Sequence, residues 1–170
     1  MIFAIVLISS CSLKYGDTVS VEEKIPEFVF QDATITRYED KKVTVEIAAA
    51  TLEQYKDTSE TFAKEVEFTA YNDEGEIRTE GNCGYLFTDT DKEIYELYDN
   101  IELFNHDDNT KFFADVLKWN AKNEQLTSGR GDMVRIETED TIMHGSGFSA
   151  SGISKNFVFT GTVTGDIETK

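Results

Sequence analysis

After Glu27, apolar and polar residues alternate with a period of two along most of the chain. This alternation is typical of β-strands, because successive side chains of a strand point to opposite faces of its sheet. The clearest rows are Val43, Val45 and Ile47; Val66, Phe68 and Ala70; Thr79, Gly81, Cys83, Tyr85 and Phe87; Tyr95, Leu97, Asp99, Ile101 and Leu103; and Phe157, Phe159, Gly161, Val163 and Ile167. We therefore expect long antiparallel strands of roughly ten residues each.

Short polar segments separate these rows and suit hairpin turns. They are Glu39–Lys41, Asn72–Gly75, Asp89–Asp91, Asn105–Asn109, Asn120–Glu124 and Lys155–Asn156. Residues Ala48–Glu65 are harder to interpret, because the spacing of Leu52, Tyr55, Phe62 and Val66 also fits a short helix. We predict strand here as well.

A weak internal repeat supports stacked hairpins. Ala114–Trp119 aligns with Gly145–Ala150 at a shift of 31 residues, and with Glu80–Tyr85 at a shift of 34. Each unit is about two strands long, and glycines within the strands permit the bulges and bends that a rolled sheet requires. The predicted fold is all-β, an antiparallel sheet folded into a sandwich or an open roll.

Composition narrows the function classes. A chain of 170 residues with 39% hydrophobic and 12% aromatic residues is expected to form one folded domain with a sizeable core. Its 33 acidic and 16 basic residues give a net charge of −17, which repels nucleic acid and the phosphates of a membrane surface. Nucleic-acid binding is therefore excluded, and charge alone does not attract the chain to a membrane.

The first residues resemble an export signal. Residues 1–10 are uncharged and largely apolar, and Ile8–Cys11 resembles the lipobox of bacterial lipoproteins, in which the cysteine is acylated and becomes the new N-terminus. We therefore expect residues 1–10 to be a lipoprotein signal peptide, residues 11–25 a lipidated tether beginning at Cys11, and residues 26–170 the folded domain. The alternative is a buried strand that happens to end in cysteine.

Catalytic chemistry is not evident. His106 and His144 lie in no nucleophile elbow or metal-ligand pattern, and no pair of carboxylates stands out among so many acidic residues. The acidic turn Asn105–Asn109 has oxygen ligands but lacks the glycine and closing glutamate of a calcium loop. Arg130–Asp132 matches a short adhesion tripeptide that chance explains, and Cys83 is expected to be a small buried residue. We predict a protein that is not an enzyme and needs no metal or cofactor.

Three segments carry a resemblance to a known family. They resemble the periplasmic LptC proteins of lipopolysaccharide export, and related LptA and OstA-type domains have a similar pattern. The segments are Pro26–Thr36, Phe113–Lys122 and Gly145–Ala150. The resemblance runs from about Pro26 to the C-terminus. It implies an open antiparallel β-jellyroll, in which two sheets form a V whose apolar interior holds the acyl chains of the lipid.

The resemblance also implies a role and partners. The protein would take lipopolysaccharide or a related glycolipid from an ABC transporter of the inner membrane and pass it to an LptA-like β-jellyroll, edge strand to edge strand. It would be periplasmic and held at the inner membrane rather than the outer one, here by lipid on Cys11 instead of the family's usual transmembrane helix. The candidate groove-lining residues, chosen by alternation, are Phe28, Phe30, Val45, Ile47, Phe68, Tyr85, Ile101, Leu103, Leu117, Trp119, Phe148, Phe157 and Phe159.

Three functions remain open from the sequence. The first is the lipid-conducting component just described. The second is a structural or adhesive surface lipoprotein, which would have a closed and fully packed β-sandwich. The third is a carbohydrate-binding or carbohydrate-processing domain, which would require paired carboxylates in a cleft or an exposed aromatic platform.

Overall fold

The structure, a computed structural model, describes residues 25–55, 59–151 and 156–167. The described residues form strands and turns and include no helix, which confirms the all-β prediction. The strands are β1 (Phe28–Glu39), β2 (Lys42–Gln54), β3 (Glu60–Tyr71), β4 (Ile77–Asp89), β5 (Ile94–Asn105), β6 (Thr110–Asn120), β7 (Gln125–Thr127), β8 (Met133–Glu137), β9 (Thr141–Ser146), β10 (Phe148–Ser151), β11 (Phe157–Phe159) and β12 (Val163–Ile167). The stretch Ala48–Glu65 therefore contributes to β2 and β3 and is not helical.

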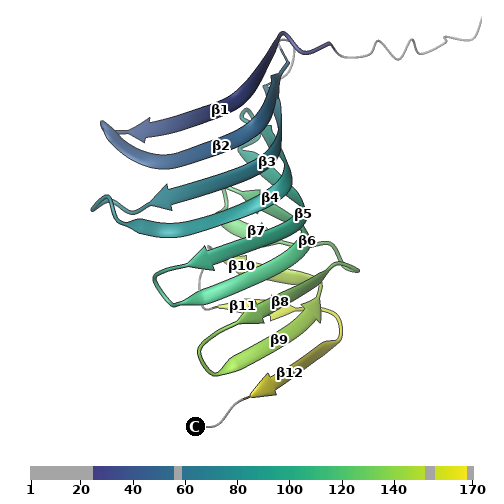
Figure 1. The fold of residues 1–170 in the computed structure, drawn as a ribbon. Coiled ribbons are helices and arrows are strands. Elements are labelled where there is room, and N and C mark those ends of the chain that lie inside the picture. The colour runs from purple at the N-terminus through teal and green to yellow at the C-terminus, as the bar shows by residue number, and fades with distance from the viewer. Residues whose placement is uncertain (1–24, 56–58, 152–155, 168–170) are drawn as a thin grey trace, which may run out of the picture.

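All strand pairs are antiparallel, and from β1 to β6 each strand pairs with the next one in the chain. Figure 1 shows the strands stacked in this order along the long axis of the molecule. Beyond β6 the sheet divides, because the end of β6 pairs with β7 and its beginning pairs with β8. One branch continues through β10 to β11, and the other through β9 to β12.

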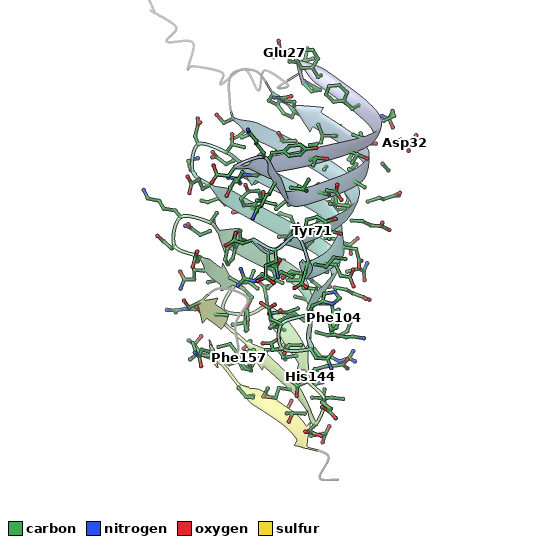
Figure 2. The ribbon with its side chains drawn as sticks, turned by 90° about the vertical axis from the view of Figure 1, so that its left-hand side faces the viewer. Glu27, Asp32, Tyr71, Phe104, His144 and Phe157 are labelled. Atoms are coloured by element: carbon green, nitrogen blue, oxygen red, sulfur yellow. The ribbon has the colours of Figure 1, made fainter. Side chains whose placement is uncertain are left out.

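Each long strand is bent near its middle, and the bends lie side by side across the sheet. Pairing is interrupted at Asp32 of β1, Glu65 of β3 and Gly84 of β4, and it shifts register at Asp99 and Asn100 of β5. Figure 2 shows Asp32 at the bend of β1, with the bends of later strands below it. We call this row of interruptions the bend line.

Positive φ angles explain how the strands turn at the bend line. Asp32, Glu65, Asp99 and Asn100 have φ angles of 50°, 51°, 65° and 49°. Aspartate and asparagine adopt this left-handed conformation more readily than other non-glycine residues, which suits three of these positions. At the bend of β4, a Cβ on Gly84 would lie 2.7 Å from an Asp99 carboxylate oxygen, so the close approach requires glycine.

The bend line divides the sheet into two arms. The β11 arm contains Phe28–Gln31 of β1 and ends in β7, β10 and β11, while the β12 arm contains Ala33–Glu39 and ends in β8, β9 and β12. In the last part of the chain the bend has become a break, so β7 and β8 correspond to two halves of one long strand. The pairs β9 and β10, and β11 and β12, are related in the same way.

The two arms face each other, and their facing surfaces are the inner faces of the molecule. Phe112 of the β12 arm and Phe148 of the β11 arm have ring centroids 5.9 Å apart. A Cβ added to Gly145 of β9 would lie 2.5 Å from the ring of Phe159 in β11. The prediction of an open β-jellyroll with two sheets in a V is confirmed in this form, one sheet creased into two arms.

In every long strand except β5, the inner row changes parity when it crosses the bend line. In β5 two residues, Asp99 and Asn100, occupy the bend, so Leu97 and Ile101 stay in one alternating row. In β4, Thr79 and Cys83 are buried on the inner face before the bend, and Leu86 and Thr88 are buried after it. The predicted row through Tyr85 and Phe87 is therefore wrong beyond Cys83, because the bend turns these two side chains to the outer face. Strict alternation across a whole strand does not survive a bulge of this kind.

Two other predictions need correction at the bend line. The predicted row from Phe157 to Ile167 is two strands, since β11 and β12 belong to different arms and are separated by Thr160–Thr162. The repeat marks inner positions that flank the bend: Cys83 and Leu86, Ala114 and Leu117, and Gly145 and Phe148, each pair 31 residues after the previous one. The alignment at a shift of 34 was therefore three residues out of step.

The packed core lies where the arms meet, toward the C-terminal end of the stack. Most of its fully buried members come from β5 to β10 and include Ile101, Leu117, Val134, Ile136 and Phe148, each at most 1% exposed, while Val66 of β3 is also 1% exposed. Phe157 and Phe159 pack against this core. Contact between inner faces therefore stabilises the C-terminal end most strongly.

We predict that Gly145→Ala reduces stability by about 1–3 kcal/mol, because the new methyl group would be forced against the Phe159 ring between the arms. Gly131→Ala is the matched control, since a Cβ there meets nothing within 4 Å, and we expect it to change stability by less than about 0.5 kcal/mol. Urea unfolding measures both. Equal midpoints would mean that the arms do not pack at Gly145.

Candidate functional site

The inner faces are apolar near the bend line and more polar toward the tips of the arms. In the β11 arm the row next to the bend is Phe30, Leu52, Ala63, Leu86, Leu97 and Leu117. In the β12 arm the second row from the bend is Ile35, Ile47, Phe68, Gly81, Leu103, Phe112, Ile136 and Met143. The tip row of the β12 arm includes Thr79, Asn105 and Thr110, and that of the β11 arm combines Gln54, Thr61 and Thr88 with Phe28, Trp119, Leu126 and Phe157.

Exposure of the inner face changes steeply along the stack. In the row of the β12 arm it falls from 42% at Ile35 in β1 to 4% at Leu103 in β5 and 0% at Ile136 in β8. In the β11 arm, Phe28 and Phe30 of β1 are 49% and 46% exposed, and their rings stack 6.0 Å apart. The V is therefore filled at its C-terminal end and presents apolar side chains to solvent at its N-terminal end. We call Phe28, Phe30 and Ile35 the open strip.

All candidate groove residues except Tyr85 lie on the inner faces, but they differ in burial. Ile101, Leu103, Leu117 and Phe148 are buried in the core, and Phe68, Trp119, Phe157 and Phe159 pack against it. Ile47 also packs against the core, while Val45 is half-buried in the tip row of the β12 arm. Phe28 and Phe30 belong to the open strip. Sequence alternation identified the correct face but could not distinguish sealed positions from accessible ones.

Tyr85 is the exception, because it lies on the outer face. It pairs with Lys64 and Tyr98, which share that face, and it is 50% exposed. Together with Phe62 and Phe87, whose ring centroids are 4.9 Å apart, these residues line a shallow outer hollow of about 250 Å³. Exposed rings of this kind are what the carbohydrate-binding hypothesis required, and that hypothesis stays a prediction.

A carboxylate beside this hollow accepts a hydrogen bond from one of its tyrosines. Tyr98 donates a hydrogen bond of 2.6 Å to Glu96, which also pairs with Lys118 at 2.8 Å. The hydrogen bond to Glu96, followed by partial burial, raises the pKa of Tyr98 to about 12. Lys118 and Tyr98 in turn lower the pKa of Glu96 below its usual range. Tyr98 therefore stays a neutral hydrogen-bond donor at physiological pH.

Sequence reasoning missed a polar contact that crosses the V. Arg37, in the tip row of the β12 arm beside Val45, donates a hydrogen bond of 3.3 Å from Nη1 to the hydroxyl of Tyr95 in the tip row of the β11 arm. Its Nη2 lies 2.9 Å from Glu39. The alternation in the sequence could have predicted that Arg37 faces inward, because Arg37 continues the row of Ala33 and Ile35.

The remaining predicted features are accounted for as follows. Cys83 is buried with a free thiol, as expected, and desolvation raises its pKa to about 11. The predicted signal peptide, Cys11 and nearly all of the tether lie outside the described residues. Within the described ranges, no group of three or more histidine, cysteine or acidic side chains is arranged to hold a metal ion. In the same part of the chain, no helix has the length and hydrophobicity to cross a membrane.

The fold and the open strip define a class of protein, a creased antiparallel β-roll with an apolar interior accessible at one end. The family described as lipopolysaccharide-assembly, LptC-related, matches residues 1–168. The chain belongs to the LptC family. It is also 24% identical over 160 residues to an uncharacterized protein of Treponema pallidum (strain Nichols), an alignment that covers 94% of this chain and 80% of that protein.

Family membership sets the general role. The LptC family is associated with transport, so the chain is involved in lipopolysaccharide transport and its place is in the periplasmic envelope. The resemblance found in Pro26–Thr36, Phe113–Lys122 and Gly145–Ala150 is thereby confirmed at the level of family and fold.

We predict that the two ends of the V respond differently to truncation of a phenylalanine. Phe148→Ala should lower the free energy of unfolding by about 3–5 kcal/mol, because Phe148 is 1% exposed and its loss leaves a cavity between the arms. Phe30→Ala should cost about 1 kcal/mol or less, because half of that ring is already in water. Chemical denaturation measures both, and similar costs would contradict an open N-terminal end.

Proposed function

We propose that this protein holds the acyl chains of lipopolysaccharide or a related glycolipid between its arms and passes the lipid onward. The observation that carries the proposal is the open strip, apolar side chains that face the interior of the V yet remain 42–49% exposed. Contact with hydrocarbon would remove them from water, at about 0.8 kcal/mol for each methylene group that is buried. Apolar side chains that stay exposed in this way mark a binding site, because a ligand that covers them gains this free energy.

The arrangement of polar groups supports an amphiphile rather than a purely apolar ligand. Apolar rows lie along the bend line, and the threonines, Gln54 and Asn105 lie toward the tips of the arms. A lipid lying in the V would place its chains against the apolar rows and its headgroup near the tips and solvent. The net charge of −17 repels an anionic headgroup, so the outer surface would not bind the lipid by its headgroup.

The ends of the stack are suited to pairing with neighbouring β-domains. In the described part of the chain, β1 pairs with β2 only, and β11 and β12 each pair with a single strand. Such strands leave backbone groups for a partner strand. We propose that β1 docks on the transporter and that the end formed by β11 and β12 docks on the next β-jellyroll. Cys11 would carry the lipid that holds the chain at the inner membrane.

The alternative of a closed, structural β-sandwich has less support. A closed sandwich requires both inner faces to be filled along their length. Here inner residues from β2 to β10 are buried, but the three members of the open strip in β1 are not.

A photocrosslinking amino acid placed at Phe30 should capture lipopolysaccharide in cells. Phe30 faces the interior and is 46% exposed, whereas its neighbour Val29 is on the outer face with 53% exposure and serves as the matched control. Adducts are detected by immunoblotting for the lipid. Leu103 should give little adduct, because it is sealed in the core at 4% exposure.

Equal capture from positions 29 and 30 would show that contact with lipid does not depend on the inner face. Capture from neither position, in cells that export lipopolysaccharide, would contradict the groove as the lipid site. Both outcomes are independent of whether the protein joins the export complex through its edges.

Edge pairing makes a separate prediction. The same photocrosslinker at Thr164 of β12 should join the chain to the LptA-like β-jellyroll, because Thr164 is exposed on an end strand. Glu67 is also exposed but lies on β3 inside the stack, so the photocrosslinker at Glu67 should not capture this partner. Mass spectrometry identifies the captured protein. Capture of this partner from Glu67 in place of Thr164 would exclude docking through the β12 edge.

A further inference from the structure

Arg37 is the charged residue within the inner-face rows that the structure describes between the bend line and the tips. The neighbouring members of its row are uncharged, and the rows closer to the bend contain apolar residues and glycine. The chain as a whole carries about twice as many acidic as basic residues, 33 against 16. A cation that faces inward in such a protein calls for an explanation in terms of what enters the V.

The position of Arg37 places it beside the open strip. It follows Ile35 by two residues on the same face of β1, which corresponds to about 7 Å along a strand. Its guanidinium reaches over the V to the Tyr95 hydroxyl of the other arm at 3.3 Å. A group bound to Arg37 would therefore lie between the tips, directly above hydrocarbon resting on Ile35.

The present partners of Arg37 can be exchanged. The side chain is 56% exposed, and its ion pair with Glu39, which is 60% exposed, is of the surface kind that contributes little to stability. Its hydrogen bond to Tyr95 is long and uses one of five N–H donors. A ligand that replaced these partners of Arg37 would therefore cost the protein little stability.

Guanidinium chemistry indicates what the ligand group is. Arginine binds phosphate through paired N–H donors, and such charge-assisted hydrogen bonds are about twice as strong as neutral ones. Elsewhere the field of the protein repels phosphate, so a cation at the tips would select the orientation in which the headgroup phosphate points out of the V.

We propose that Arg37 binds the phosphate of a lipid headgroup whose acyl chains occupy the open strip. On binding, Arg37 exchanges the Tyr95 hydroxyl for phosphate oxygens. This assignment rests on the proposed function, because it requires a lipid in the V, and it adds the group that fixes the lipid's orientation.

The test measures binding of lipid A, with and without its phosphates, to the full chain and its variants. Arg37→Gln should weaken binding of phosphorylated lipid A at least about tenfold, the loss of one charge-assisted contact, and leave the dephosphorylated lipid within about twofold. Arg78→Gln is the matched control. It removes the same charge from a side chain that is 55% exposed, in a pair with Asp107 away from the inner face, and should bind both lipids normally.

A second pair of variants separates the cation from the contact between the arms. Tyr95→Phe removes the hydroxyl but keeps the ring, so it should bind phosphorylated lipid A as well as the wild type or better. Arg37→Lys keeps the charge and should retain part of the affinity. If Tyr95→Phe weakened binding as much as Arg37→Gln, the hydrogen bond between the arms would be what matters, and the assignment would be wrong.

The remaining outcomes are equally decisive. Normal binding of both lipids to Arg37→Gln, equal loss for both lipids, or the same loss in Arg78→Gln would overturn the role of Arg37 while leaving lipid binding intact. Binding of inorganic phosphate alone as tightly as phosphorylated lipid A would indicate a free-phosphate site and also overturn it. Failure of the wild type to bind either lipid would refute the proposed function, and the assignment of Arg37 with it.

Discussion

The structure depends on one geometric constraint, the alignment of the strand bends. Neighbouring strands remain paired on both sides of the bend line only because each turns at the same register. The change of parity at the bend then keeps apolar residues on the concave side of both arms, as Cys83 and Leu86 illustrate. If one strand ran straight, half of its inner residues would point into water and its neighbours would lose their pairing.

From this constraint follows the difference between the ends of the molecule. At the C-terminal end the bend becomes a break, and the inner faces meet there, where Phe148 of β10 contacts Phe112 of β6 and Phe157 and Phe159 of β11. At the N-terminal end the strands are long and continuous through the bend, and Phe28 and Phe30 remain half-exposed. The same sheet therefore supplies a packed core for stability and an accessible apolar surface for a ligand.

The polar features have positions that complement this division. Asp32 and Asp99 permit the left-handed turns of the bend line, where their exposed carboxylates remain in water. Arg37 and Tyr95 lie at the opposite, open side of the V, where the arms are joined by one long hydrogen bond. The apolar rows thus lie between the polar bend line and the contact of Arg37 with Tyr95, which is the arrangement expected for the proposed binding of an amphiphile.

By itself the sequence determined the class of fold, the family and most of the inner-face residues, because a period of two and local turn residues depend on neighbours within a few positions. It did not determine the face of Tyr85, because the bend at Gly84 reverses the parity of the inner row in β4 without a reliable local signal. Nor did it determine the division of Phe157–Ile167 into β11 and β12. Which inner residues are sealed and which are open was decided by the tertiary structure alone. Exposure of Phe30 and burial of Phe148 depend on how closely the arms approach, and that distance is set by contacts such as Gly145 with Phe159 between strands of different arms.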